Sequence, residues 1–335
     1  MNYPFNTKIT NFFGTRLPIV AGGMQWLSDA KYVGAAAKAG MIGFITAGSF
    51  PDLDALRKEI RHCRDLADGL PFGVNVSMLP KLVEGEKTDL IFDLIIDEGV
   101  RFVETAGRNP EKYLPRLHHA GIKVLHKVPA VKYAQKAQDI GVDAVTVVGA
   151  ECGGHPGMDL VGTIVQAAIA ARKITIPLVI GGGIGNGAQI VAALALGADG
   201  VIIGTRFLVA EEIWAHRAFK EQLIKADETG TMLIMKTLKN TLRALRNDTA
   251  QTVHRLEQEH GGNLDVLMPH ISGKVGRMAY ETGDTSVGAL ATGQSVAFAD
   301  RIEPLVVIAG RLEKEMIEAM SRLRELSKNC LQSKI

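Results

Sequence analysis

The chain has 335 residues, of which 47% are hydrophobic, and its formal net charge is +2. This length allows one large core or two smaller ones, and the near balance of charge argues against nucleic acid or an anionic membrane surface as a partner. No apolar run is as long as a membrane span, the N-terminus lacks a signal-peptide pattern, and three widely spaced cysteines indicate neither disulfides nor a zinc site. We therefore expect a cytoplasmic protein without a metal centre.

Short apolar runs alternate with segments of helical pattern along the first two thirds of the chain. The predicted strands are 18–23, 42–46, 72–78, 101–106, 123–128, 144–149, 178–180 and 201–203. The predicted helices are 29–39, 51–67, 88–98, 111–120, 131–140, 160–172 and 189–196. Pro51 is placed in the first turn of its helix, where its missing N–H costs nothing.

These eight βα units in a row require parallel strands joined by helical crossovers. An open doubly wound sheet would also alternate in this way. The count of eight and the polar residues at the strand ends (Asn75, Glu104, Lys127 and Glu151) favour a (β/α)8 TIM barrel, which gathers such residues at its C-terminal face.

Two glycine turns follow the last two predicted strands. The first contains Gly182 and Gly183, and the second is Gly204-Thr205. Glycine lets the backbone approach a ligand closely, and the outward amides of such turns suit a phosphate. Alternatively, these glycines only make tight connections between strand and helix.

Three polar residues could serve a ligand at the same end of the barrel. Lys127 in a barrel mouth would be costly unless it faced an anion or an electron-rich ring, or formed a salt bridge to Glu104 or Glu151. Asn75 offers an amide for the edge of a heterocycle, or else a capping group. His155 lies in a Gly-Gly-His-Pro-Gly loop, where it could act as a base, an acid or a donor to a carbonyl, or bond its own loop.

The pattern changes after residue 207. Residues 211–273 read as charged helix without strand signals, and 233–246 as an amphipathic helix. One of its stripes is apolar (Ile234, Leu238, Leu242, Leu245) and the other is basic (Lys236, Lys239, Arg243, Arg246). We predict a barrel over 1–210, a small helical cap domain over 211–273, and a loop and final helix over 274–335 that return to the barrel. The basic stripe is either a solvated face or an anion site for a cofactor phosphate.

The sequence lacks the motifs of three other classes of enzyme: it contains no GxxxxGK[ST] phosphate-binding loop, no GxSxG nucleophile elbow and no HExxH zinc motif. Gly23, Met24 and Gln25 follow the first strand, where glycine again allows approach to a flat ligand. A phosphate after strands seven and eight, a lysine and an amide for a ring, and a nearby histidine fit FMN better than a sugar phosphate. Cys152 has no partner cysteine close in sequence and is interpreted as a packing residue.

Several motifs between about residues 17 and 293 carry a family likeness: GGMQW, GVNVSMLP, VETAGRNP, HKVPAV, ECGGHPG, GGGI, GTRF, LIMKTLKNTLRALRN and GDTSVG. With these, the chain resembles the nitronate monooxygenase (2-nitropropane dioxygenase) superfamily of FMN-dependent barrels. Within it, the chain is most similar to the bacterial NADH:quinone reductases. One departure is that Met158-Asp159-Leu160 follows the ECGGHPG motif, where that branch has acidic residues.

The resemblance implies a role for each site residue. The phosphate would lie on the amides of Gly182, Gly183, Gly204 and Thr205, and the flavin ring would meet Gly23, Met24, Asn75 and Lys127. Gly153 and Gly154 would line the same pocket, and His155 would lie nearest the substrate.

The expected activity is NAD(P)H:quinone reduction, with NADH or NADPH docking between barrel and cap before a quinone takes its place. Three alternatives stay open: nitronate monooxygenation with oxygen, a flavin-dependent enoyl reductase, and a non-catalytic flavin-binding scaffold or sensor. The choice between NADH and NADPH and the assembly state, with a homodimer as one option, are also left open.

Overall fold

In the computed structural model, which describes residues 5–78 and 87–332, eight parallel strands close into a barrel in chain order. The strands are β1 (Ile19–Ala21), β2 (Ile42–Thr46), β3 (Gly73–Met78), β4 (Phe102–Gly107), β5 (Lys123–Val128), β6 (Ala144–Val148), β7 (Leu178–Gly181) and β8 (Gly200–Ile203). The barrel closes where β8 pairs with β1, with Ala21 opposite Ile203. The predicted (β/α)8 barrel is therefore confirmed.

Helices follow the strands on the outside of the barrel. They are α2 (Ala30–Lys38), α3 (Leu53–Ala67), α4 (Thr88–Asp97), α5 (Leu114–His119), α6 (Val131–Asp139), α7 (Thr163–Lys173) and α8 (Gly187–Ala195). Several of these helices begin with a capping side chain. Asp52, for example, accepts a hydrogen bond from the Ala55 N–H at the start of α3. The placement of Pro51 in the first helical turn is wrong, because it precedes this cap.

The interior of the barrel is apolar at its N-terminal end. Inward residues of the strands form one cluster there, with members such as Val20, Phe44, Phe102 and Leu125. Helix α1 (Lys8–Phe13), which the sequence analysis did not predict, closes this end. The Phe13 ring packs edge-on against Phe102, with 5.1 Å between ring centroids.

The chain after the barrel is not all helical, so that part of the prediction is wrong. It contains α9 (Arg217–Ile224), β9 (Thr231–Ile234), β10 (Leu242–Leu245), α10 (Asp248–His260), α11 (Leu264–Ile271), α12 (Gly273–Thr282) and α13 (Leu305–Gln332), with 3-10 turns η3 (Thr205–Val209) and η4 (Gln294–Phe298). Strands β9 and β10 form an antiparallel hairpin where the amphipathic helix was predicted. The segment predicted as a loop and final helix over 274–335 begins inside α12, which extends to Thr282.

A hairpin and a helix would both place the apolar residues of this segment on one face, and this explains why the helix was predicted wrongly. Ile234 and Leu242 lie opposite each other in the hairpin and are both buried in one cluster against α10. Their spacing of eight residues suits two turns of helix equally well. Glu257 of α10 stabilises the hairpin. Its carboxylate accepts hydrogen bonds from the backbone N–H groups of Met235 and Thr237, at 2.7 and 2.9 Å, and these bonds fix the turn.

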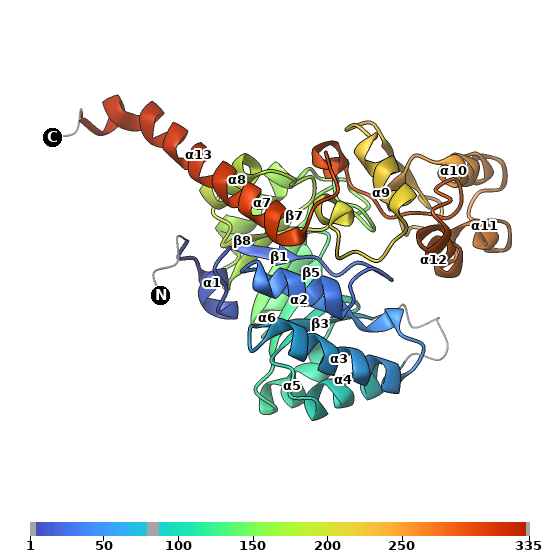
Figure 1. Cartoon of the computed structure of the whole chain (residues 1–335), viewed down its shortest axis with the longest axis horizontal. Helices are drawn as coiled ribbons and strands as arrows, with labels where there is room; N and C mark the ends of the chain where they lie inside the picture. The colour runs from blue at the N-terminus through green and yellow to red at the C-terminus, as the bar shows by residue number, and fades with distance from the viewer. Residues whose placement is uncertain (1–4, 79–86, 333–335) are drawn as a thin grey trace.

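Figure 1 shows the barrel in the centre, α10–α12 gathered at one end, and the C-terminal half of α13 extending beyond the barrel at the other. The division of these parts into separate domains stays a prediction. Within the described ranges, no helix combines the length and apolar character that a membrane crossing needs.

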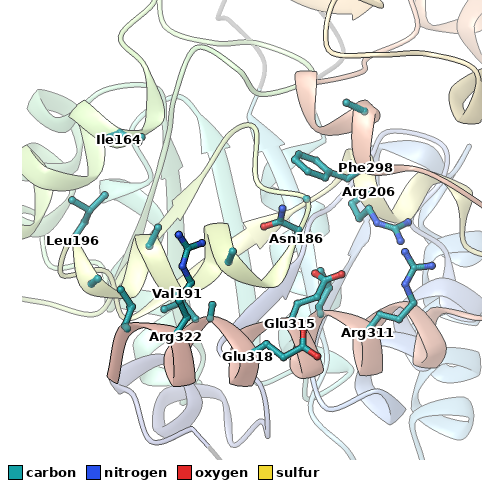
Figure 2. Close-up of a pocket in the computed structure, with 18 of the residues that line it drawn as sticks. Ile164, Asn186, Val191, Leu196, Arg206, Phe298, Arg311, Glu315, Glu318 and Arg322 are labelled. Atoms are coloured by element: carbon teal, nitrogen blue, oxygen red, sulfur yellow. The ribbon is translucent and has the colours of Figure 1, made fainter. Parts of the chain in front are cut away.

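A pocket of about 1020 Å³ lies outside the barrel between α8 and α13. Figure 2 shows Leu196 and Val191 toward one end of the pocket, with Arg322 beside Val191, and Arg206 and Arg311 at the other end. None of the predicted site residues lines it. The candidate site is therefore at the barrel mouth, where those residues lie.

Candidate active site

Three neighbouring strands bring Asn75, Glu104 and Lys127 into one cluster. Asn75 pairs with Glu104 across β3 and β4, and the end of β5 places Lys127 beside them. The Glu104 side chain is fully buried, and its Oε2 accepts hydrogen bonds from Asn75 Nδ2 and, at 3.1 Å, from Lys127 Nζ. Of the two salt bridges that the sequence left open for Lys127, the one to Glu104 is therefore formed.

This cluster has hydrogen-bonding groups left over that a ligand could use. Among the described residues, Glu104 Oε1 is buried and has no hydrogen-bond partner. The Lys127 side chain is 22% exposed, and its one ion pair in the described chain is the bond to Glu104. An ammonium group carries three donors, so the lysine can also meet an acceptor on a bound ring.

The loop after β1 lies directly against this cluster. A Cβ added at Gly23 would lie 3.1 Å from the Cβ of Asn75, so only glycine fits there without displacing the amide. The Met24 N–H donates to Ser28 Oγ at 2.7 Å, which fixes the loop. Gln25 is exposed at the tip of this turn, so its predicted role in cofactor binding stays a prediction.

The two glycine turns after β7 and β8 complete the far side of the mouth. Gly182 and Gly183 have φ values of 106° and 72°, a left-handed backbone that favours glycine. A Cβ at Gly182 would lie 2.7 Å from Thr163 Oγ1, which is itself 2.8 Å from the Gly182 carbonyl oxygen. Gly204 borders mainly open space, since the nearest atom to a Cβ there would be Met24 Sδ at 3.9 Å.

Glu151 joins the β7 turn to the loop after β6. Its carboxylate accepts from the Thr163 N–H and, at 2.7 Å, from Thr163 Oγ1. A Cβ added at Gly183 would lie 2.9 Å from the Cβ of Glu151. Glu151 is thus a structural support for the glycine turn and not the partner of Lys127.

Segments distant in sequence form the remaining wall. Gly154 exchanges two backbone hydrogen bonds with Arg243 of the hairpin, at 3.1 and 2.7 Å. A Cβ at Gly153 would lie 2.7 Å from the backbone N of Gly293, whose N–H donates to Thr205 Oγ1 at 2.9 Å. The structure therefore brings Gly153, Gly154 and Thr205 together at one wall, while their predicted roles in ligand binding stay predictions.

His155 stands apart from this group. Its side chain is exposed and lines a separate pocket of about 280 Å³ next to the loop. The surrounding protein nevertheless removes enough water to lower the pKa of the imidazole, so the neutral ring dominates near pH 7. Burial raises the pKa of the neighbouring Cys152 thiol to about 12, in keeping with a packing residue.

Left-handed backbone at non-glycine residues concentrates around the mouth. Among the described residues five adopt it, and four of them are Trp26, Leu160, Met235 and Lys239. Trp26 lies in the loop after β1, Leu160 in the loop after β6, and the other two in the hairpin turn. Such strain persists where the surrounding structure enforces it, and it is common at functional sites.

Three residues contribute more to the site than the sequence indicated. Glu104, expected only as one of two possible salt-bridge partners of Lys127, also holds Asn75. Arg243 was assigned to a helix face, and Gly293 lay in a loop without a predicted role. The Gly/Thr-rich stretch around Gly293 was the one usable signal, because glycine in such a loop permits close backbone approach. In the described part of the chain, no group of three or more potential ligand side chains could hold a metal ion.

The fold is a (β/α)8 barrel, and its mouth brings together two glycine turns, a lysine and an amide. The nitronate monooxygenase family model matches residues 6–312. The chain therefore belongs to the nitronate monooxygenase family and is an oxidoreductase.

Relatives of this chain carry several names. An octahydro-indene-carboxyl-CoA dehydrogenase of Mycobacterium tuberculosis is 31% identical over 277 residues, which are 82% of this chain and 75% of the relative. A probable nitronate monooxygenase of Staphylococcus saprophyticus is 28% identical, over 76% of this chain and 82% of its own.

Solved structures agree with this placement. FabK from Thermotoga maritima superposes with a TM-score of 0.87 at 32% identity, covering 96% of this chain and 99% of its own. A nitroalkane oxidase from Streptomyces ansochromogenes superposes with a TM-score of 0.78 at 26% identity, covering 95% of this chain and 100% of its own.

Proposed function

We propose that the protein is an FMN-dependent oxidoreductase that takes a hydride from NADH or NADPH and reduces a quinone by two electrons. The overall reaction converts NAD(P)H, a proton and a quinone into NAD(P)⁺ and a hydroquinone. The observation that carries the proposal is the Asn75–Glu104–Lys127 cluster, which lies next to the loop of Gly23 and across the mouth from two glycine turns.

The residues at the mouth fit FMN. The left-handed turn at Gly182 and Gly183 and the open side of Gly204 suit the phosphate, with the amide of Thr205 beside it. The unpartnered Glu104 Oε1 and the free donors of Lys127 suit the polar edge of the ring. Bound FMN supplies a carrier that accepts a hydride and releases two electrons.

The chain's own residues then control charge and protons. Lys127 places a cation at the edge of the ring site, where it stabilises negative charge. His155, neutral because its pKa is lowered, can donate an N–H hydrogen bond to the substrate oxygen. The hairpin and Gly293 shield one side of the mouth from water.

A thioester oxidoreductase is the second candidate. It is favoured by the CoA-thioester name of the 31% identical relative and by the likeness to FabK over almost the whole chain. The same cluster and glycine turns would serve an enoyl thioester in place of a quinone. Nitronate oxidation, which the family name and the nitroalkane oxidase suggest, is the competing use of the same mouth.

Anaerobic mixing of the FMN-loaded protein with NADH, and separately with NADPH, tests the proposal by bleaching of the flavin absorption band. Fast, saturable bleaching supports the reductase, and reoxidation by a quinone or by crotonyl thioester then identifies the acceptor. Bleaching by an alkyl nitronate alone would replace the proposal with the monooxygenase. No bleaching by any of these would point to a flavin-binding scaffold. A cytoplasmic location and a homodimer stay predictions that need measurements in cells and by sedimentation.

A further inference from the structure

A second pocket, of about 280 Å³, lies beside the loop after β6 and is lined in part by His155. Its walls come from three parts of the chain: the start of α6, the loop after β6 and the turn between β9 and β10. The lining residues used below are Lys132, Tyr133, His155 and Lys239. The volume lies just below the range of complete small-molecule sites, so the pocket suits one end of a longer ligand.

The side chains of this pocket give it a net positive charge. Lys239 is exposed in the hairpin turn and makes no ion pair within the described chain. The Lys132 ammonium lies 3.7 Å from the Asp159 carboxylate, so the charges of these two residues roughly cancel. His155 adds a neutral hydrogen-bonding ring. One uncompensated cation beside a neutral donor suits a phosphate-type anion.

An aromatic surface lies beside this charge. Tyr133 is 44% exposed, high for so large an apolar ring, and the Lys132 ammonium lies 5.2 Å from its ring centroid. An exposed aromatic ring next to lysines is a stacking platform for a nucleobase. A phosphate and a base together describe a phosphorylated nucleoside.

The position of Lys239 is fixed by the protein. The residue has a φ of 52°, and its N–H donates to the Lys236 carbonyl at 3.0 Å. The turn that carries it is held by the buried carboxylate of Glu257, which accepts from two backbone N–H groups and from Thr237 Oγ1. Thr241 Oγ1 lies 3.2 Å from Met158 Sδ and joins the turn to the His155 loop. The backbone that carries the Lys239 side chain is therefore a supported turn at the edge of the pocket.

We propose that this pocket binds the phosphorylated adenosine end of the substrate, with its phosphate on Lys239 and its base against Tyr133. The inference rests on the proposed function for the reactive end of that molecule, which would reach the barrel mouth past His155. The adenosine phosphate could belong to a nicotinamide nucleotide or to a coenzyme A thioester, since both carry this group.

Titration calorimetry of the full chain at low ionic strength, without any electron transfer, tests the pocket directly. The probes are ADP, 2′,5′-ADP and 3′,5′-ADP, which represent the ends of NADH, NADPH and coenzyme A. At least one probe is expected to bind, and Lys239→Gln should weaken it by about tenfold, the loss of one hydrogen bond to a charged group. Tyr133→Leu should weaken the same probe by a similar factor.

Lys236→Gln is the matched control, because Lys236 is exposed in the same turn but does not line the pocket. The proposal is overturned if no probe binds at millimolar concentration, or if Lys236→Gln and Lys239→Gln weaken binding equally. The tightest probe identifies the source of the adenosine phosphate.

Flavin bleaching separates this inference from the proposed function. Probe binding that depends on Lys239, without bleaching by NADH or NADPH, leaves the pocket standing and removes the reductase. Bleaching by NADH or NADPH, together with probe binding that Lys239→Gln leaves unchanged, keeps the reductase and removes the pocket.

Discussion

Gly154 and Arg243 are joined by a pair of backbone hydrogen bonds, although one follows β6 of the barrel and the other lies in the hairpin. The Arg243 side chain strengthens this connection, since its Nε donates to the Ala150 carbonyl at 3.0 Å. Burial lowers the pKa of the guanidinium without making it neutral near pH 7. The hairpin is thus a fixed part of the mouth.

Breaking the Lys127–Glu104 pair on one side should harm the protein more than removing both charges. Lys127→Met leaves the Glu104 carboxylate buried without its cation, and we expect a loss of about 3–5 kcal/mol in the free energy of unfolding. The double variant Lys127→Met/Glu104→Gln should recover most of this loss. Urea unfolding of wild type, both single variants and the double variant measures the coupling; strictly additive losses would contradict it.

Gly153→Ala should disturb the site, because its Cβ would lie 2.7 Å from the backbone N of Gly293. We expect a loss of about 1–3 kcal/mol in stability from overpacking, together with less FMN bound per chain. Gly310→Ala is the control, because Gly310 is exposed in α13 and no atom lies within 4 Å of an added Cβ. Since alanine favours a helix more than glycine does, the free energy of unfolding should rise by about 0.5–1 kcal/mol in this variant. Equal effects of the two substitutions would refute the close approach at Gly153.

His126 should make the protein less stable in mild acid. It is buried, its Nδ1 lies 2.8 Å from Thr105 Oγ1, and burial lowers its pKa to about 4. Between the ordinary pKa near 6.5 and about 4, the unfolded chain binds a proton that the folded chain excludes. Stability therefore falls as the pH drops through this window, by about 3 kcal/mol in total. His126→Gln should flatten this part of the stability curve, whereas the exposed His62→Gln should follow wild type.

His155→Ala should slow the oxidative half of the proposed reaction. Loss of a hydrogen bond or proton at the substrate oxygen is expected to reduce reoxidation by a quinone about 100-fold, while the bound FMN per chain stays the same. Stopped-flow absorbance measures this step, and His254→Ala on the exposed face of α10 serves as the control. Unchanged turnover in His155→Ala would remove the role assigned to this histidine.

The sequence predicted the barrel well because the βα alternation is local. β2 and β5 have the predicted bounds, and Lys127 lies near the end of β5 as expected, whereas Asn75 lies in the middle of β3 and not at its end. The hairpin was mistaken for a helix because the pairing of Ile234 with Leu242 has the same spacing as a helical stripe. The contact of Arg243 with Ala150 spans 93 residues of sequence, so no local pattern could indicate it.

The aromatic closure by Phe13 has a kinetic consequence. With the opposite end of the barrel filled by α1, any two substrates that react at the Lys127 cluster must enter through the mouth, and the proposed reaction has them occupy it in turn. Initial rates measured against both substrates should then give parallel double-reciprocal lines. Intersecting lines would mean that donor and acceptor share the mouth at the same time.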